Sequence, residues 1–364
     1  MDIKKLDKNF DMTFVAPEDL EWFSIEEAPF SLHGVTYSKE EGLYRRLPKA
    51  VAEATSEGVA FLSKNTAGGR VRFSTNSPYI AVRMEEPWTA PMSHMTIAGT
   101  YGVSLFVNNK FVGTVMPSYA QIANATNGKI IFDGIKYPYG VGEKAYQAEI
   151  FFPLYSAVNS IYIGLKKGCV LQEAKAYKHT APVLFYGSSI TQGGCACKPA
   201  DDYVNRLSRM LNTEILNLGF SGNAKGERAM AEYIASQNAS VFVMDYDYNA
   251  PDAEYLAKTH FALYETIRKS HAKTPIIMMT KPAIAGYEYR PGNKERKEVI
   301  WNTFAKAKEQ GDNNVYFVDC YGCFGEMENG ECGTVDDCHP DSLGFLRMAE
   351  RVYPVLNTLL NGEE

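Results

Sequence analysis

The sequence has no run of about 20 apolar residues, the length that a membrane-spanning helix requires. The N-terminal stretch MDIKKLDKNFDMTF interrupts its apolar residues with charges, so the continuous apolar core of a signal peptide is missing. No run of Lys and Arg is present, and the net charge of −6 opposes binding to a phosphate backbone. These absences predict a cytoplasmic protein with neither a membrane nor a nucleic acid as its partner.

Cysteine is scarce and scattered, with seven residues in 364, an odd number that does not suit a secreted disulfide framework. Reduced thiols are therefore expected. Four cysteines near the C-terminus could be interpreted as zinc ligands, or as a redox-sensitive surface cluster: Cys320, Cys323, Cys332 and Cys338. The five residues between the last two do not match the paired ligands of zinc ribbons, which favours the surface cluster and leaves metal binding open.

The composition is that of a globular protein, with 45% hydrophobic and 22% charged residues and no low-complexity segment. Single hydrophobic cores stop growing near about 250 residues, so a chain of 364 residues is expected to form two domains. The pattern of apolar residues changes near residues 172–181. We therefore predict one domain over residues 1–175 and a second over residues 176–364.

The first half alternates apolar and polar residues, which is typical of half-buried strands. Strands are expected at 70–74, 79–84, 104–107 and 129–133. Asn108 and Asn109 separate two such runs, a pattern typical of a two-residue hairpin. This pattern predicts an antiparallel β-sandwich, jelly-roll-like, with little helix, whose exposed edges could support a homo-oligomer.

The second half contains nearly continuous apolar runs, as strands covered on both faces require. These runs lie at 183–187, 214–218, 240–245, 275–280 and 314–319. The segments between and after them carry apolar residues at helical spacing: 202–212, 225–237, 253–270, 293–310 and 342–360. The alternation predicts an α/β domain with a five-stranded, doubly wound parallel sheet and helices on both faces, whose functional loops follow the carboxyl ends of the strands.

Two of these loops carry the residue types of nucleophilic catalysis. The first strand runs into a turn of small residues, Gly187–Gly194, that can hold the Ser189 hydroxyl clear of the backbone. The last loop contains Asp336 three residues before His339, so the carboxylate can hold the imidazole while the ring faces a serine. Each signal alone is better explained by an ordinary turn or by an Asp that caps a helix. Together they predict a triad.

Acyl transfer also needs hydrogen-bond donors for the oxyanion. The loops after the second and third strands offer glycine N–H groups at 217–223 and a carboxamide at 245–251. The alternative is that both are ordinary loops rich in turn-forming residues.

The order GSSIT, NLGFSGN, DYDYNAP and DDCHP resembles blocks I, II, III and V of the SGNH/GDSL hydrolases, over residues 183–360. The resemblance implies that Ser189 is the nucleophile, that Asp336 and His339 complete the triad, and that Ser189, Gly222 and Asn249 form the oxyanion hole. It implies the flavodoxin-like SGNH fold. Two departures stand out: block I usually reads GDS where this chain has Ser188, and block III usually reads GxND. Asn223 is an alternative to Asn249 as the donor.

The first half resembles the β-sandwich domain that precedes some bacterial GDSL-like hydrolase domains, with GlyValSerLeuPhe at 102–106 where that domain often has GxDLY. Trp88 and His94 lie in a loop that could overhang the active site, although such residues more often have a core or surface role.

The residues predict a serine esterase that needs no metal or other cofactor. The resemblance implies that it removes short acyl groups, most plausibly acetyl, from a carbohydrate, because related enzymes with a sandwich before the SGNH domain tend to act on sugars. The expected substrate is a small-molecule or oligosaccharide ester. An acyltransferase is the alternative, because an alcohol can intercept the same acyl-enzyme. A noncatalytic carbohydrate-binding protein is disfavoured, because it would need no serine, Asp-x-x-His pair and donor loops together.

Overall fold

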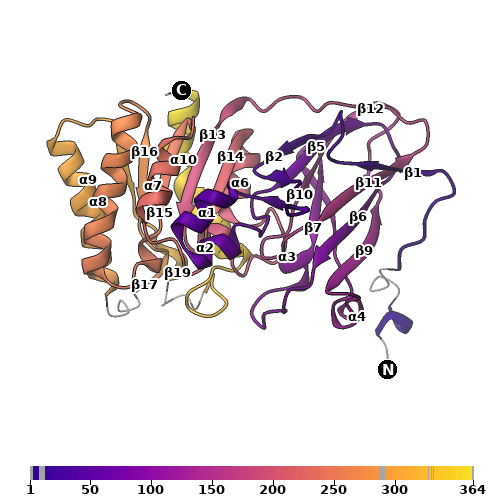
Figure 1. Cartoon of the computed structure of the whole chain (residues 1–364), viewed down its shortest axis with the longest axis horizontal. Coiled ribbons are helices and arrows are strands. Elements are labelled where there is room, and N and C mark those ends of the chain that lie inside the picture. Colours follow the sequence, from indigo (N-terminus) through magenta and orange to yellow (C-terminus); the bar gives the residue numbers. More distant parts are fainter. Residues whose placement is uncertain are drawn as a thin grey trace.

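The computed structural model describes residues 3–7, 13–286, 292–326, 328, 330 and 332–362. A β-sandwich forms one end of the molecule and an α/β unit forms the other (Figure 1). Among the described helices, none combines the length and the apolar character needed to span a membrane.

Two antiparallel sheets form the sandwich. The first has the order β1 (Leu20–Ser24), β11 (Ser160–Lys166), β6 (Ile80–Pro87) and β9 (Lys129–Lys136). The second has the order β12 (Leu171–Gln172), β5 (Arg70–Thr75), β10 (Tyr146–Phe151), β7 (Val103–Val107) and β8 (Lys110–Val115), with β2 (Ser31–His33) also on β5. The predicted antiparallel sandwich is confirmed. In the hairpin between β7 and β8, Asn108 and Asn109 have φ of 48° and 62°, as a two-residue turn with both residues left-handed requires.

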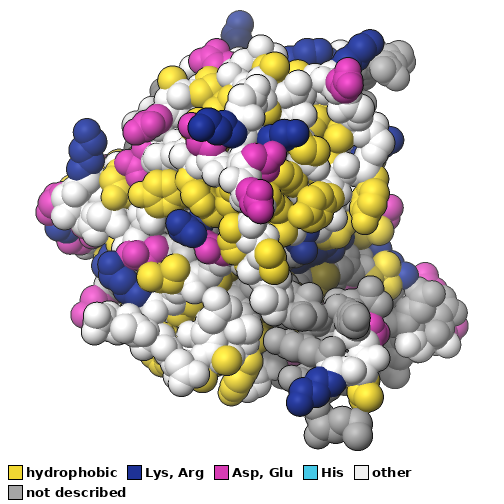
Figure 2. Space-filling model, turned by 90° about the vertical axis from the view of Figure 1, so that its right-hand side faces the viewer, with side chains coloured by type: hydrophobic (Ala, Val, Ile, Leu, Met, Phe, Trp, Pro, Cys, Tyr) yellow, Lys and Arg dark blue, Asp and Glu magenta, His cyan; other side chains and the backbone are white. Residues whose placement is uncertain are grey.

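Alternation along the strands separates the core from the surface. Ile130 and Phe132 of β9 are buried in the sandwich core, whereas Ile131 between them is 55% exposed. The sheet that contains β9 lies at the sandwich end of the molecule, and hydrophobic side chains gather in a band on the face seen there (Figure 2). The expected homo-oligomer remains a prediction.

The C-terminal unit is a five-stranded parallel sheet with the order β14 (Thr213–Gly219), β13 (His179–Gly187), β15 (Val241–Asp245), β16 (Ile276–Met279) and β18 (Val315–Val318). This is the 2-1-3-4-5 order of flavodoxin-like sheets. One face is covered by α7 (Arg228–Ala235), α8 (Ala253–Ser270) and α9 (Asn293–Glu309), the other by α6 (Tyr203–Leu211) and α10 (Ser342–Asn361). The predicted α/β fold is therefore confirmed.

Helices α1 (Lys49–Thr55) and α2 (Glu57–Leu62) were not expected from the sequence. Ala52 and Val59 are fully buried in the same core as Leu218 and Phe220, and α1 contacts α7. Part of the first half of the chain therefore closes one face of the parallel sheet. The division at residues 175 and 176 remains a prediction.

The smaller elements are η1 (Ile3–Lys5), β3 (Thr36–Ser38), β4 (Leu43–Arg45), α3 (Ile97–Tyr101), α4 (Tyr119–Ala123), α5 (Ser189–Gln192), η3 (Asp247–Asn249), β17 (Ala283–Ala285) and β19 (Tyr321–Glu326). Of these, α3, α5 and η3 surround the candidate site.

Candidate active site

Ser189 lies where the central strand β13 turns into the short helix α5. The Ser188 hydroxyl caps this helix by accepting the N–H of Ile190 at 3.1 Å, which shows what Ser188 does in the turn. As the first helical residue, Ser189 has a backbone N–H for which the helix offers no acceptor. A side chain at Gly187 would place its Cβ 2.4 Å from the carbonyl oxygen of Asp245, so only glycine fits there. The turn thus holds a hydroxyl and a donor at the carboxyl edge of the sheet.

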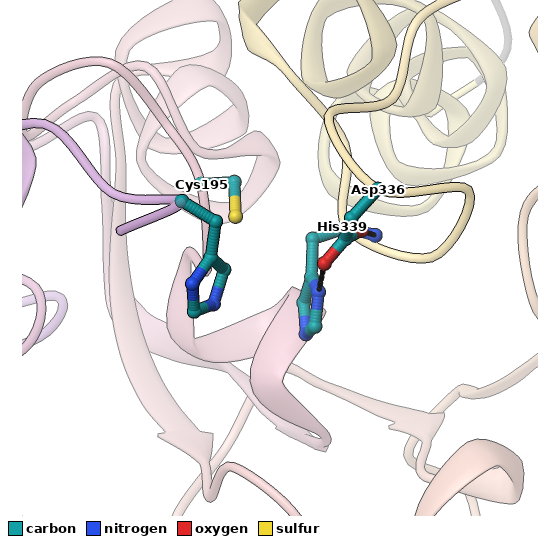
Figure 3. A group of neighbouring side chains, drawn as sticks. Cys195, Asp336 and His339 are labelled. Atoms are coloured by element: carbon teal, nitrogen blue, oxygen red, sulfur yellow. Dashed lines mark hydrogen bonds and ion pairs between the residues drawn. The ribbon is translucent and has the colours of Figure 1, made fainter. Parts of the chain in front are cut away.

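Three side chains form a continuous hydrogen-bonded series. Ser189 Oγ lies 2.9 Å from His339 Nε2. His339 Nδ1 lies 2.8 Å from Asp336 Oδ2 (Figure 3). The other carboxylate oxygen accepts the backbone N–H of His339 at 2.7 Å and that of Cys338 at 3.1 Å. The structure therefore brings together the three residues predicted as the triad, in the geometry of a serine, a base and the group that orients the base.

The alternative that Asp336 caps a helix does not fit the structure. Helix α10 is capped by Asp341, whose Oδ1 accepts the N–H groups of Leu343 and Gly344 at 2.8 and 2.9 Å. Burial acts to raise the pKa of Asp336, but hydrogen bonds from His339 and Cys338 and the nearby imidazole outweigh it and hold that pKa below its usual value. An ionised Asp336 is suited to hold the imidazole in one orientation.

Two of the predicted oxyanion residues, Gly222 and Asn249, also lie in contact. The Asn249 amide is oriented here so that both its nitrogen and its oxygen have a hydrogen-bond partner. In this orientation the nitrogen donates to Phe220 O at 3.1 Å, and the oxygen accepts from Gly222 N at 3.2 Å. The amide nitrogen carries a second N–H besides the one donated to Phe220 O. The alternative donor, Asn223, donates instead to Ser221 O at 2.7 Å. Its amide also lies against α2, since a Cβ at Gly58 would come within 2.0 Å of its oxygen.

Sequence reasoning missed Asp245, a buried carboxyl beneath the turn. Its Oδ2 accepts the hydroxyls of Thr191 at 2.8 Å and Tyr203 at 2.7 Å, so it ties α5 to β15 and α6. Burial raises its pKa to about 7, against the hydrogen bonds from Tyr203 and Thr191. The only signal in the sequence was an Asp at the end of a buried strand.

The sandwich half also contacts the turn. Tyr155 donates its hydroxyl to Ser189 O at 3.3 Å, and Gln192 Nε2 donates to Leu154 O and to Asn65 Oδ1, both at 3.2 Å. No pattern in the sequence pointed to these residues. Of the loop residues that were singled out, His94 lies beside the site, with its ring centroid 5.7 Å from that of His339. Trp88 is half exposed, and among the residues that the structure describes no contact places it at the site.

The C-terminal cysteines are not a surface cluster, because Cys320 and Cys323 are buried. Within the described part of the chain, these two do not join Cys332 and Cys338 in a group of metal ligands. The group that could hold an ion consists instead of His94, Cys195, Asp336 and His339, whose ligand atoms lie within 4.8 Å of one another.

Comparison with known families agrees with both halves of the fold. Residues 180–357 match the GDSL-like Lipase/Acylhydrolase family, and residues 20–171 match the family described as the N-terminus of SGNH-hydrolase-type esterases, named GxDLY. A search of curated proteins by sequence finds no match.

Solved structures with the same architecture cover nearly the whole chain. A protein named as a GDSL-like lipase from Bacteroides ovatus is 25% identical, with a TM-score of 0.81 over 94% of this chain and 98% of that one. A salicylyl-acyltransferase from a tetracycline biosynthetic pathway is 18% identical, with a TM-score of 0.73 over 94% and 98%. An acetyl xylan esterase from the rumen bacterium Butyrivibrio proteoclasticus is 14% identical, with a TM-score of 0.60 over 95% and 100%. The last two likenesses show the fold alone.

Proposed function

Because this chain belongs to the GDSL-like lipase/acylhydrolase family and carries the N-terminal domain of SGNH-type esterases, we propose that it hydrolyses carboxylic esters with Ser189, His339 and Asp336 as its catalytic triad. The observation that carries the proposal is the unbroken series of hydrogen bonds from Ser189 Oγ through His339 to Asp336. This series joins a serine at the end of the central strand to a base and its orienting carboxylate.

In the first step, His339 Nε2 takes the proton of the Ser189 hydroxyl as the oxygen attacks the ester carbonyl. Asp336 keeps the imidazole in the required tautomer and stabilises its positive charge. The carbonyl oxygen becomes an oxyanion. It accepts hydrogen bonds from the Ser189 N–H, from the second N–H of the Asn249 amide and from the Gly222 N–H. The Gly222 N–H is then shared between the oxyanion and the Asn249 side-chain oxygen.

The tetrahedral intermediate breaks down when His339 gives its proton to the departing alcohol oxygen, which leaves the acyl group on Ser189. His339 then removes a proton from a water molecule, and the resulting nucleophile attacks the acyl carbonyl. A second breakdown releases the acid and returns the proton to Ser189. His339 carries every proton that is transferred in these reaction steps, so the chemistry requires no metal ion.

We propose acetyl as the acyl group and a carbohydrate as the alcohol. The support is the likeness in fold to the acetyl xylan esterase and to family two carbohydrate esterases, one of them in complex with cellohexaose. An acyltransferase on the same three residues is the second candidate, favoured by the higher TM-score of 0.73 with the salicylyl-acyltransferase. The two outcomes differ in whether water or a bound alcohol reaches the acyl-enzyme.

The test is hydrolysis of p-nitrophenyl acetate, p-nitrophenyl butyrate and acetylated xylo-oligosaccharides near neutral pH with EDTA present. We expect turnover that favours acetate and disappears in Ser189→Ala. Ser188→Ala is the matched control, because it removes the neighbouring hydroxyl but leaves the proposed nucleophile. Transfer of acetyl to an added sugar would identify the acyltransferase. Turnover that survives Ser189→Ala would exclude the proposed nucleophile.

A further inference from the structure

Two members of the triad belong to a group of side chains that could ligate a metal ion and that come from three separate segments of the chain. His94 comes from the loop before α3, Cys195 from the segment after α5, and Asp336 and His339 from the loop before α10. One ligand atom from each of the four lies within 4.8 Å of the others. Figure 3 shows the Cys195 side chain on a different loop from Asp336 and His339 but beside the same space.

The segments that carry His94 and Cys195 are attached to each other. Thr96, two residues after His94, donates its hydroxyl to the carbonyl of Cys197 at 2.6 Å. Helix α3 packs so closely on this segment that a Cβ at Gly99 would lie 2.4 Å from the carbonyl oxygen of Ala196. These two contacts hold the loop of His94 against the segment of Cys195, so the proximity of His94 and Cys195 is built into the fold.

Cys195 occupies a backbone position that favours glycine. Its φ is 70°, in the left-handed region, and its side chain is buried. The chain therefore presents a thiol where local geometry would prefer no side chain. His94, in contrast, is exposed on its loop.

Two imidazoles, a thiol and a carboxylate form a donor set that suits Zn²⁺. Tetrahedral zinc with bonds of about 2.0–2.3 Å places its ligand atoms about 3.4 Å apart. The present separations, all within 4.8 Å, must therefore shorten by up to about 1.4 Å. A rotation of the exposed His94 side chain can supply part of this movement.

We propose that His94, Cys195, Asp336 and His339 form an inhibitory binding site for Zn²⁺ or a divalent cation of similar softness. Inhibition rests on the proposed function, because the ion takes His339 and Asp336 away from Ser189. On binding, the Cys195 thiol releases its proton to solvent and the thiolate bonds to the ion. An imidazole whose lone pair is held by zinc cannot accept the proton of the Ser189 hydroxyl, so ester hydrolysis stops.

Binding is tested on EDTA-treated, desalted full-length protein by titration with Co²⁺, a spectroscopic substitute for Zn²⁺, followed by displacement with Zn²⁺. We expect one equivalent of Co²⁺ to produce a thiolate-to-cobalt absorption band that Zn²⁺ removes. Cys195→Ser should abolish the band, and His94→Ala should weaken binding by at least about tenfold. Cys197→Ser and His179→Ala are the matched controls and should bind as the wild type does. Cys338→Ser tests the other nearby thiol.

Activity is measured in parallel with p-nitrophenyl acetate. Zn²⁺ should inhibit the wild type, whereas His94→Ala, measured against its own turnover without Zn²⁺, should require at least about tenfold more Zn²⁺ for half-inhibition. The site is overturned by an absent band, or by a band that survives Cys195→Ser and disappears in Cys338→Ser. Binding with undiminished hydrolysis overturns the inhibitory role. Binding by a protein without any esterase activity contradicts the proposed function and leaves the metal site in place.

Discussion

The guanidinium of Arg46 donates to the carbonyl of Gly219 at 2.5 Å, although the two residues lie 173 positions apart in the chain. The same side chain also donates to the carbonyls of Leu62, Asn65 and Asn217, at 2.7, 2.8 and 3.2 Å. Burial lowers its pKa to about 9. Arg46 thus joins the end of α2 to the end of β14, from which the Gly222 loop departs.

Replacing Arg46 with Lys should destabilise the protein, because an ammonium group cannot reproduce the planar fork that reaches four carbonyls. We expect a loss of about 3 kcal/mol in the free energy of unfolding, since buried acceptors are left without donors. Urea denaturation measures the loss. Arg83→Lys is the control, because this arginine pairs with Asp133 at a partly exposed site and should cost less than about 1 kcal/mol. Equal losses would argue against the role of Arg46.

Asp336→Asn should lower kcat by roughly 10³- to 10⁴-fold, because an amide cannot stabilise the imidazolium or fix its tautomer. Steady-state kinetics with p-nitrophenyl acetate measure the change. Asp337→Asn is the matched control: this neighbouring carboxylate is exposed, lies outside the series of hydrogen bonds to Ser189, and should change kcat little. A larger loss in Asp337→Asn would reassign the carboxylate.

Asn249→Ala should lower kcat by about 10²- to 10³-fold with a small change in KM, because an oxyanion donor acts mainly in the transition state. Asn223→Ala should leave kcat within a few fold, since the Asn223 amide is bonded to Ser221 O. The comparison distinguishes the two candidate donors. The reverse order of effects would transfer the oxyanion role to Asn223.

Gly194→Ala should impair catalysis by crowding. Its Cβ would lie 2.9 Å from the Tyr155 hydroxyl oxygen, 3.0 Å from Ser189 O and 3.2 Å from His339 Cδ2. We expect kcat to fall about tenfold or more, since a small displacement of the base lengthens the bond to Ser189. Adding Tyr155→Phe removes the closest contact and should restore part of kcat. An unchanged kcat in Gly194→Ala would show that the surrounding atoms shift to accommodate the methyl group without displacing His339.

Asp245→Asn tests the buried carboxyl beneath Thr191. Its folded-state pKa of about 7 lies above the ordinary value of 3.8, so its contribution to stability is fully present below pH 3.8 and is lost as the pH rises through 7. An asparagine side chain does not titrate, so the Asp245→Asn variant does not lose this stability as the pH rises. Relative to the wild type, it should therefore gain stability between about pH 4 and pH 7, by up to about 4 kcal/mol. Urea denaturation of both proteins at pH 5 and pH 8 measures the difference, and a constant difference would contradict the raised pKa.

The sequence alone determined the elements whose patterns are local. Period-two alternation predicted the sandwich strands, and long apolar runs predicted the buried parallel strands to within a few residues. Because the carboxyl ends of parallel strands meet at one edge of a sheet, it followed that the loops with Ser189 and His339 would come together. Their residue types and order then indicated the chemistry.

Only the tertiary structure decided which distant segments meet. The short helices α1 and α2 carry too few turns for a clear periodic signal, and the position of α1 beside α7 depends on packing across the whole chain. The same holds for Arg46 with Gly219, for Tyr155 with Ser189 and for His94 with Cys195. A hydrogen bond or a shared ligand site between residues far apart leaves no repeat or spacing in the sequence, because it is made only when the folded backbone places both groups within reach.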